Sequence, residues 1–455
     1  MRRPLLALCA LLPSVAVAQG DPTEILATFK LADKTAYVTR TDVALEMAFH
    51  LRRRDEGRQA VDVLVESELT RRAAVAKGVM PSTAELRSYW DGLQQQLRAA
   101  GRNPQDIAAV RNMTEAQLFE YLAVQMAQER LVRKELALKA NDAVSGDMIK
   151  LWLQEERKRS KIETNPDRLP AGTACLIDDQ PIAIDQLGNL LLRTSDEEQI
   201  TEFVQQVAFL LSVEEMARNY GVTLAAEDLD AAIAARRADA AKDARYRGMS
   251  FEQLLESQGL TVAALRDLRV FRAKTMLPLL AAKRTPDAEL RRSVREDRSA
   301  VLDRVGPRRR IGVIFVRAAE TPNALIPNDF AAAEAKLVAA KARIAKDGFA
   351  LVARIESDEP LTKQRGGDTG WHNKQGANLP QFLVDAAYAL AVGEVSAPLR
   401  GDDGCYLVST LEAEPDLDDE QLVARLRERA ADDLKKQIVE GLQLQRGNGE
   451  TPTKK

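Results

Sequence analysis

Apolar residues recur at helical spacing over most of this chain and alternate at strand spacing in only a few short segments. Near the start, Leu26–Leu31 and Ala36–Thr39 predict a strand pair joined across Asp33 and Lys34, and Thr41 opens a helical run. Further helices are expected at about 59–78, 82–99 and 114–139. The chain is therefore expected to begin with a short hairpin followed by helices.

Two of these helix starts carry a capping pair. Ser82 follows Pro81 and lies three residues before Glu85, while Thr114 lies three residues before Gln117. In such pairs the hydroxyl and the longer side chain satisfy backbone N–H groups that the first helical turn leaves free. Both positions therefore predict a helix start.

The same order of elements recurs in the second third of the chain. Cys175–Ile177 and Ile182–Ile184 predict another strand pair, and Asp185 is expected to cap a helix that contains Leu187, Leu190 and Leu191. Gly221-Val222 repeats Gly78-Val79 at nearly the offset by which Leu260-Thr261 repeats Met113-Thr114. We interpret this as a duplicated helical domain; the alternative is two unrelated helical regions of similar composition. The predicted copies are residues 24–155 and 172–300, joined by a charged, proline-containing linker at 156–171.

A mixed pattern follows Gly306 and Pro307. One helix is expected at about 328–346, with a stop at Gly348, and a second near Leu383–Leu390. A turn at 401–404 leads into an expected strand at Cys405–Leu411. Helices and strands in this order indicate a compact α+β domain at about 306–415.

The centre of that domain is the turn Gly366-Gly367-Asp368-Thr369-Gly370-Trp371. Its glycines mark backbone that needs positive φ or close approach, and Asp368 can accept local hydrogen bonds. Trp371 is large and apolar, so we expect it to anchor the turn to the core.

These features together resemble the parvulin family of peptidyl-prolyl cis/trans isomerases. The resemblance covers about residues 308–413 and rests on the elements Gly348–Ala353, Ser357-Asp358, the glycine turn, Pro380-x-Phe382 and Gly393–Pro398. It implies a four-stranded sheet with helices, and a cleft in which the amide of a bound proline is twisted.

The resemblance also implies site residues, position by position. Parvulins use two facing histidines, which fall here on Val313 and Tyr406, and a Cys or Asp, which falls on Glu359. The proline pocket of the family contains a Phe, kept as Phe382, and a Met, which falls on Asn378. Glu359 and Tyr406 are thus the candidate catalytic positions, and Phe382, Asn378 and Val313 the candidate substrate-binding positions.

For four other residues near this site we expect no catalytic or binding role. His372 falls on neither histidine position, and we expect it at the surface. Arg308, Arg309 and Arg310 are expected to be a solvated approach to a strand rather than an anion site.

Each predicted helical copy is similar to the N-terminal chaperone domain of SurA-type periplasmic foldases, although two copies depart from the usual single unit. In such chains a C-terminal helix packs back on the helical domain, and an apolar stripe at about 416–446 predicts that helix. Residues 447–455 are expected to be disordered. The predicted fold is therefore α+β and mostly helical, with two SurA-N-like helical domains, a parvulin-like domain and a C-terminal helix.

Residues 1–18 predict a cleavable export signal. Arg2 and Arg3 precede a short apolar run that ends in Ala16-Val17-Ala18, and cleavage is expected after Ala18. A membrane anchor and a lipoprotein acylated at Cys9 are the weaker alternatives. The expected location is a bacterial periplasm.

The composition limits which classes of partner are expected for this chain. The net charge of −3 gives no reason to expect nucleic acid, no later segment predicts a membrane span, and no metal or cofactor motif is found. Cys175 and Cys405 are expected to be buried free thiols rather than a disulfide. The expected partners are unfolded or partly folded polypeptides and proline-containing segments. Two functions stay open: a foldase whose isomerase site is degenerate, and a non-catalytic holdase that uses the parvulin-like domain only to bind peptides.

Overall fold

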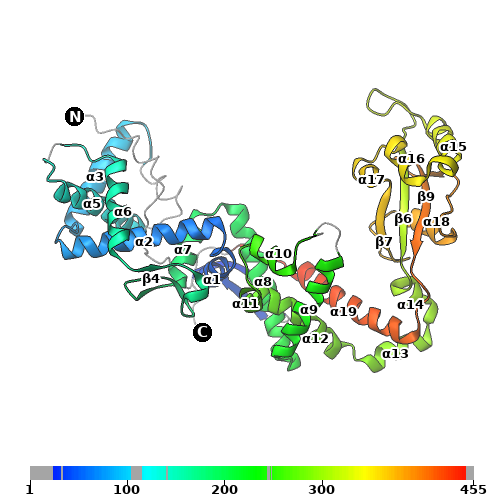
Figure 1. Ribbon diagram of the computed structural model, residues 1–455, viewed down its shortest axis with the longest axis horizontal. Coiled ribbons are helices and arrows are strands. Elements are labelled where there is room, and N and C mark those ends of the chain that lie inside the picture. Colours follow the sequence, from blue (N-terminus) through cyan, green and yellow to red (C-terminus); the bar gives the residue numbers. More distant parts are fainter. Residues whose placement is uncertain are drawn as a thin grey trace. The chain divides into compact units, whose positions relative to one another are not determined.

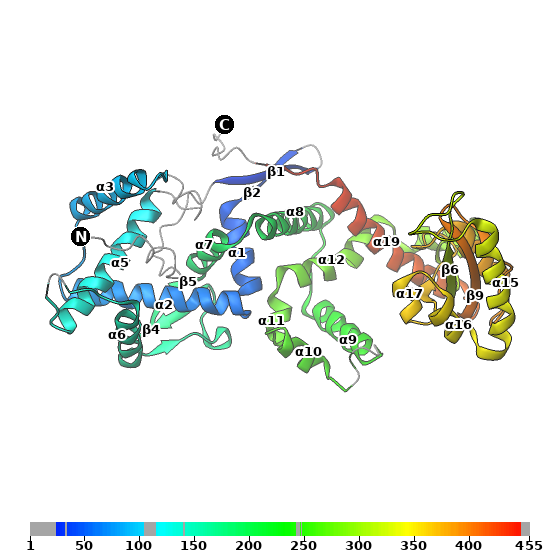
Figure 2. The ribbon, with the colours of Figure 1, turned by 90° about the horizontal axis from the view of Figure 1, so that it is seen from above.

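The computed structural model describes residues 24–31, 34–103, 115–139, 142–242, 246 and 248–446. They form two compact units (Figures 1 and 2). The first extends to Leu277 and includes the chain from Lys435 onward, and the second is Pro278–Leu434. The predicted signal segment 1–18, the tail 447–455 and the capping residue Thr114 lie outside the described residues.

The first unit is mostly helical. Its elements are β1 (Ile25–Leu31), β2 (Lys34–Thr39), α1 (Arg40–Leu51), α2 (Asp55–Ala76), α3 (Thr83–Ala99), α5 (Glu115–Glu135), α6 (Gly146–Arg159), β3 (Ile162–Glu163), the 3₁₀ turn η2 (Pro166–Arg168), β4 (Thr173–Ile177), β5 (Gln180–Ala183), α7 (Ile184–Thr194), α8 (Glu197–Tyr220), α9 (Ala226–Lys242), α10 (Phe251–Ser257), α11 (Val262–Asp267), most of α12 (Arg269–Arg284) and β10 (Gln445–Arg446).

The second unit combines helices with one sheet. Its elements are α13 (Asp287–Glu296), α14 (Arg298–Val305), β6 (Arg309–Arg317), α15 (Phe330–Asp347), α16 (Phe349–Glu356), α17 (Pro360–Gln364), β7 (Asp368–His372), α18 (Gln381–Ala389), β8 (Leu399–Arg400), β9 (Gly404–Ala413) and most of α19 (Asp419–Gly441).

The capping pairs decide where several helices begin. Ser82 and Glu85 form the predicted capping box at α3, and Thr39 with Asp42 forms another at α1. The prediction that Asp185 caps α7 is wrong. The N-cap is Ala183, which has no side-chain cap, and the Asp185 carboxylate accepts a hydrogen bond of 2.8 Å from the adjacent Gln186 N–H.

Both predicted hairpins of the first unit are present. β1 pairs with β2, and β4 pairs with β5 across Asp178 and Asp179, whose φ values of 51° and 63° suit a tight hairpin turn. β3 lies within the predicted linker and adds a strand to β4 at Ile162 and Glu163.

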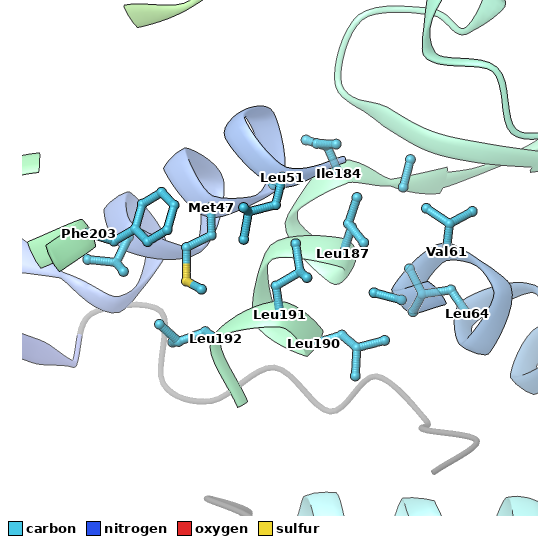
Figure 3. Close-up of a cluster of buried hydrophobic side chains, with 14 of the residues drawn as sticks. Met47, Leu51, Val61, Leu64, Ile184, Leu187, Leu190, Leu191, Leu192 and Phe203 are labelled. Atoms are coloured by element: carbon cyan, nitrogen blue, oxygen red, sulfur yellow. The ribbon is translucent and has the colours of Figure 1, made fainter. Parts of the chain in front are cut away.

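One core joins the two predicted copies. Met47 and Leu51 of α1 pack with Leu187 and Leu191 of α7, and α2 adds Leu64 (Figure 3). The order β–β–α–α–α occurs in both segments, as the predicted duplication requires, but α1 and α7 pack on each other rather than in separate cores. The domain boundaries at 155 and 172 stay a prediction.

A glycine allows α1 and α7 to approach closely. An added Cβ on Gly188 of α7 would lie 2.1 Å from the backbone oxygen of Ala44 on α1. Any side chain at this position would therefore push the two helices apart.

The last described residues belong to the first unit, although most of the predicted C-terminal helix, α19, lies in the second unit and packs there on α13 and α14. β10 pairs with β1 through Ala27 and Arg446, and Leu442 and Leu444 pack against the core. In the part of the chain that the structure describes, no helix is both long and apolar enough to cross a membrane.

The sheet of the second unit has the strand order β7-β6-β9-β8 with antiparallel neighbours. Helices α15 and α16 cover one face, where Ile314 and Leu407 are fully buried. Helix α18 covers the other face, where Val313, Phe315 and Tyr406 lie. This second face holds the residues of the predicted site.

Candidate functional site

Three aromatic rings meet at the α18 face of the sheet. Phe315 of β6 and Tyr406 of β9 are direct cross-strand partners, and their rings stack with centroids 4.7 Å apart and an interplanar angle of 28°. Phe382 of α18 meets Tyr406 edge to face, with centroids 5.7 Å apart. We call Phe315, Phe382 and Tyr406 the aromatic cluster.

The alternation of the two strands positions this cluster. On β6, Ile311, Val313 and Phe315 share one face, and on β9 Tyr406 and Val408 lie opposite them. Phe382 stands near the start of α18, where 38% of its surface stays exposed. The cluster thus has a buried base and an accessible edge.

A hydrogen bond fixes the phenol of Tyr406. Its hydroxyl donates to the carboxylate of Asp403, in the hairpin before β9. Burial raises the pKa of Tyr406 well above its usual range, and the bond to Asp403 raises it further. Tyr406 is therefore a neutral phenol at any physiological pH, with its one proton already donated.

The hairpin backbone lies against the rings. A Cβ added to Gly401 would fall 2.8 Å from Cε2 of Tyr406 and 3.2 Å from Cζ of Phe382. A glycine is needed here so that the turn can approach both rings.

The Ser-Asp loop holds the strand that carries Phe315. The Phe315 N–H donates to Oγ of Ser357 at 3.2 Å, and the Asp358 N–H donates to the Phe315 oxygen at 2.7 Å. The Asp358 carboxylate also accepts from the Arg317 N–H at 2.9 Å. Because Ser357 is fully buried, this loop serves as a structural support for β6.

The glycine turn behaves largely as predicted. Gly366, Gly367 and Gly370 have φ values of 69°, 82° and 94°, and Asp368 accepts a hydrogen bond from the Gly370 N–H at 2.9 Å. Trp371, however, is 40% exposed, so its predicted role as a core anchor is wrong. It lies on the edge strand β7, opposite Arg310, and the turn is instead held by the 2.8 Å hydrogen bond from the Val313 N–H to the Gly367 oxygen.

The structure brings together three of the five predicted site residues. Val313, Tyr406 and Phe382 lie on one face, with Val313 only 6% exposed and paired with Val408. Asn378 is exposed, and its neighbours Ala377 and Leu379 pack against the hydrophobic core on this face of the sheet. Asn378 is thus a solvent-exposed position, and its part in substrate binding stays a prediction.

Glu359 serves as the N-cap of α17 and not as part of the aromatic cluster. Its carboxylate caps α17 by accepting hydrogen bonds from the Leu361 N–H at 3.2 Å and from the Thr362 N–H and hydroxyl at 2.5 Å each. The hydrogen bonds from Thr362 hold the pKa of Glu359 below its ordinary value. Glu359 is therefore an ionised helix cap and is poorly suited to act as a general acid.

His372 differs from expectation, whereas the three arginines gain partners that were not predicted. The imidazole is half-buried and its Nε2 lies 3.0 Å from Oγ1 of Thr369; burial lowers its pKa. Arg308 pairs with Glu414, Arg310 with Asp368, and Arg309 donates to backbone oxygens of α18 and its end. Arg308 and Arg310 keep 45% and 37% of their side-chain surface exposed, so this approach to β6 is solvated as expected, and its arginines also act as structural ion-pair and hydrogen-bond partners.

Two residues of the site, Phe315 and Asp403, were not predicted from the sequence. Phe315 could have been found from strand alternation, because it lies two residues after Val313 and must share its face. Asp403 carried no such signal, since its carboxylate reaches Tyr406 only through the hairpin geometry.

The structure gives little support for a reactive thiol or for a metal site. Cys175 and Cys405 are buried and unpaired with each other, and burial raises the pKa of Cys175 to about 12. Within the described ranges, no group of His, Cys, Asp or Glu side chains could hold a metal ion. What the site offers is aromatic surface and a neutral phenol.

Comparison with known proteins identifies the type of domain that carries this site. Residues 320–411 match the family described as Rotamase: PPIC-type PPIASE domain. The chain is 36% identical to Chaperone SurA of Methylococcus capsulatus over 120 residues, which are 26% of this chain and 25% of that protein. It is 36% identical to the periplasmic chaperone PpiD of Haemophilus ducreyi over 69 residues, 15% of this chain and 11% of that protein.

A solved structure gives a wider but weaker match. The peptidyl-prolyl isomerase PrsA from Bacillus anthracis is 20% identical and covers 52% of this chain and 94% of its own, with a TM-score of 0.26. The chain thus spans a quarter or less of the length of the two curated relatives. It carries a parvulin-type domain at residues 320–411 and is similar over part of its length to the SurA, PpiD and PrsA foldases.

Proposed function

We propose that this chain is an exported foldase whose parvulin-type domain binds proline-containing segments of unfolded polypeptides and catalyses their isomerisation weakly at most. The observation that carries the proposal is the pair Val313 and Tyr406 at the two histidine positions. Val313 is a buried aliphatic residue, and the only proton of the Tyr406 hydroxyl is donated to Asp403.

The proposed weak catalysis follows from what isomerisation requires. Twisting the peptide removes amide resonance, and the barrier of about 18–20 kcal/mol falls only if groups favour the twisted amide over the planar one. Each 1.4 kcal/mol or so of lost transition-state stabilisation costs tenfold in rate. Val313 can offer no hydrogen bond, so the cluster retains binding surface but loses polar stabilisation.

Binding itself has clear support. The exposed edge of Phe382 beside Tyr406, with Leu379 and Leu399 packed nearby, offers an apolar surface for a proline ring or an aromatic side chain. The favoured clients are segments of secreted or outer-membrane proteins, in keeping with the predicted export signal. The second candidate function, a holdase without any catalysis, is favoured by the same residue, Val313.

An aggregation assay tests the proposal. The protein should slow aggregation of a denatured outer-membrane-type client at near-stoichiometric ratios, without ATP. Phe382→Ala should weaken this protection for a proline-rich client, whereas Val392→Ala, at a 60% exposed site in the same domain, should not. Unchanged aggregation in the presence of the wild-type protein would refute the proposal.

A further inference from the structure

Four cationic side chains of the first unit lie near one another without carboxylate partners. They are Arg54 at the start of α2, Arg236 of α9, Lys274 of α12 and Lys435 of α19, and we call them the cation cluster. Their sequence neighbours are paired, Arg237 with Glu252 and Lys436 with Glu440. Within the described residues, by contrast, no ion pair joins a member of the cation cluster to a carboxylate.

The packing of α1 beside α12 places His50 at this cluster. The Glu46 carboxylate of α1 lies 3.8 Å from the Arg269 guanidinium of α12. His50 follows Glu46 by four residues and Lys274 follows Arg269 by five, so both lie about one turn further along their helices. Partial burial lowers the pKa of His50, and the positive charges of Arg54 and Lys274 lower it further. His50 is therefore a neutral side chain close to two members of the cluster.

Lys274 connects the other two members. The Arg236 guanidinium lies over the ring of Phe271, 4.7 Å from its centroid, and Phe271 precedes Lys274 by three residues on α12. Partial burial lowers the pKa of Lys274, and the positive charges of Lys435 and Arg236 lower it further. The charges that act on Lys274 are thus like charges.

The imidazole of His50 adds an unused hydrogen-bond donor. A guanidinium nitrogen of Arg54 lies 3.1 Å from Nε2 of His50. Because a guanidinium can only donate, Nε2 is the acceptor and the proton of the neutral ring is on Nδ1. Nδ1 is buried and has no hydrogen-bond partner among the described residues. A donor without an acceptor therefore lies beside cations without a counter-ion.

An anion would offset this excess of positive charge. Like charges repel, and partial burial strengthens the repulsion because the local dielectric constant is lower than that of water. Glu46 and Glu214 both pair with Arg269, so they do not neutralise the cluster. All four of its members keep exposed surface, which makes them accessible to an anion from solvent. Several lysines and arginines together suit a phosphate dianion better than a single carboxylate.

We propose that the cation cluster binds a phosphate group, carried either by free inorganic phosphate or by the monoester headgroup of an anionic lipid. Arg54, Arg236, Lys274 and Lys435 supply the positive charge, and His50 supplies a neutral donor. The site lies in the first unit and depends neither on the aromatic cluster nor on the binding of polypeptides proposed above.

Nuclear magnetic resonance of the imidazoles gives the direct test, because the chain has two histidines. Inorganic phosphate, added to the full-length protein at constant ionic strength, should shift the ring nitrogens of His50 in a saturable way. The ring of His372, in the second unit, should keep its shifts. His50→Gln assigns the two signals. Unchanged His50 signals, or equal shifts of both rings, would overturn the proposal.

Removing charges tests the location of the site. Lys274→Gln combined with Lys435→Gln should weaken phosphate binding at least about tenfold in isothermal titration calorimetry. Arg272→Gln removes another exposed charge of α12, on a different side of the helix from Lys274, and should leave the affinity unchanged. Equal losses in the two variants would mean non-specific attraction and would overturn the inference. Circular dichroism checks that both variants fold.

Vesicles distinguish the two sources of the phosphate group. Flotation of the protein with phosphatidylcholine vesicles that contain phosphatidic acid, reversed by free phosphate, would identify a lipid headgroup as the ligand. Binding of inorganic phosphate without flotation would identify free phosphate, and either result supports the phosphate site. Tighter binding of a glutamate-rich peptide than of phosphate, lost in the same lysine variants, would identify an acidic polypeptide instead. That result would overturn this inference while leaving the proposed function intact.

Discussion

The ring of Phe382 meets the ring of Tyr406 edge to face, with centroids 5.7 Å apart and an interplanar angle of 77°. The pair joins the start of α18 to strand β9, and the Tyr406 hydroxyl is tied to Asp403 at its other end. Truncating Phe382 therefore removes the α18 side of this contact, and truncating Tyr406 removes its β9 side.

Phe382→Ala should lower affinity more than stability. The side chain is 38% exposed, so its removal should cost roughly 1–2 kcal/mol of stability, mostly through the lost aromatic contact. Affinity for a proline-containing peptide should fall about fivefold or more, as measured by fluorescence anisotropy. An unchanged dissociation constant would show that peptides bind elsewhere on this domain.

Gly401→Ala should close the edge of the aromatic cluster. The added methyl group would sit 2.8 Å from Tyr406 and 3.2 Å from Phe382, so one or both rings must shift. Peptide affinity should drop several-fold, and ring proton shifts of both residues should change in NMR spectra. Asp402→Ala, an exposed neighbour in the same hairpin, is the matched control and should leave the ring shifts in place.

The packing of α1 on α7 gives a prediction for the helical unit. Gly188→Ala would place a methyl carbon 2.1 Å from the Ala44 oxygen, and overpacking of this kind costs roughly 1–3 kcal/mol. The melting temperature should fall by several degrees. Gly92→Ala in α3, where an added Cβ meets nothing within 4 Å, should instead be neutral or stabilising. Equal melting temperatures for the two variants would contradict the close approach of the helices.

The ion pair between Arg308 and Glu414, at the end of the paired strands β6 and β9, should stabilise this strand pair in a way that is lost in acid. Burial disfavours the ionised carboxylate, but hydrogen bonds from Arg308 and Arg425 outweigh it and hold the pKa of Glu414 at about 2. Because the folded-state pKa lies below the ordinary value of 4.5, the stabilisation is present above pH 4.5 and is lost as the pH falls toward 2.

Hydrogen exchange of the β6 and β9 amides tests this pH-dependent stabilisation. At pH 7, Glu414→Gln should speed exchange by an amount equivalent to roughly 1 kcal/mol or less, since Arg308 is partly exposed. The difference from the wild-type protein should shrink between pH 4.5 and 3. A difference that is constant with pH would rule out the carboxylate as its cause.

How much of this molecule is readable from sequence depends on the range of each interaction. The hairpins, the capping box of Ser82 with Glu85 and the positive φ at Gly366 and Gly367 follow from local residue chemistry and were predicted, whereas the capping box of Thr39 with Asp42 was not. The error at Asp185 is also local, because the helix is capped at Ala183, two residues before the predicted cap.

Long-range packing was not readable in the same way. Three findings depend on which elements meet: α1 and α7 share one core, Trp371 is exposed on an edge strand, and Leu379 rather than the exposed Asn378 packs on the core of the α18 face. The pairing of Tyr406 with Asp403 likewise needs the hairpin fold, although Phe315 was within reach of strand alternation.

The central claim is that this parvulin-type domain binds proline segments and accelerates their isomerisation little. Exchange NMR on a single-proline peptide, with the full-length protein, measures both quantities in one sample. We predict saturable binding that Phe382→Ala weakens, with cis/trans exchange of the bound peptide accelerated by no more than about tenfold, or roughly 1.4 kcal/mol. An acceleration of about 1,000-fold that survives Tyr406→Phe would contradict the account, because catalysis would then need neither imidazole nor phenol at this site.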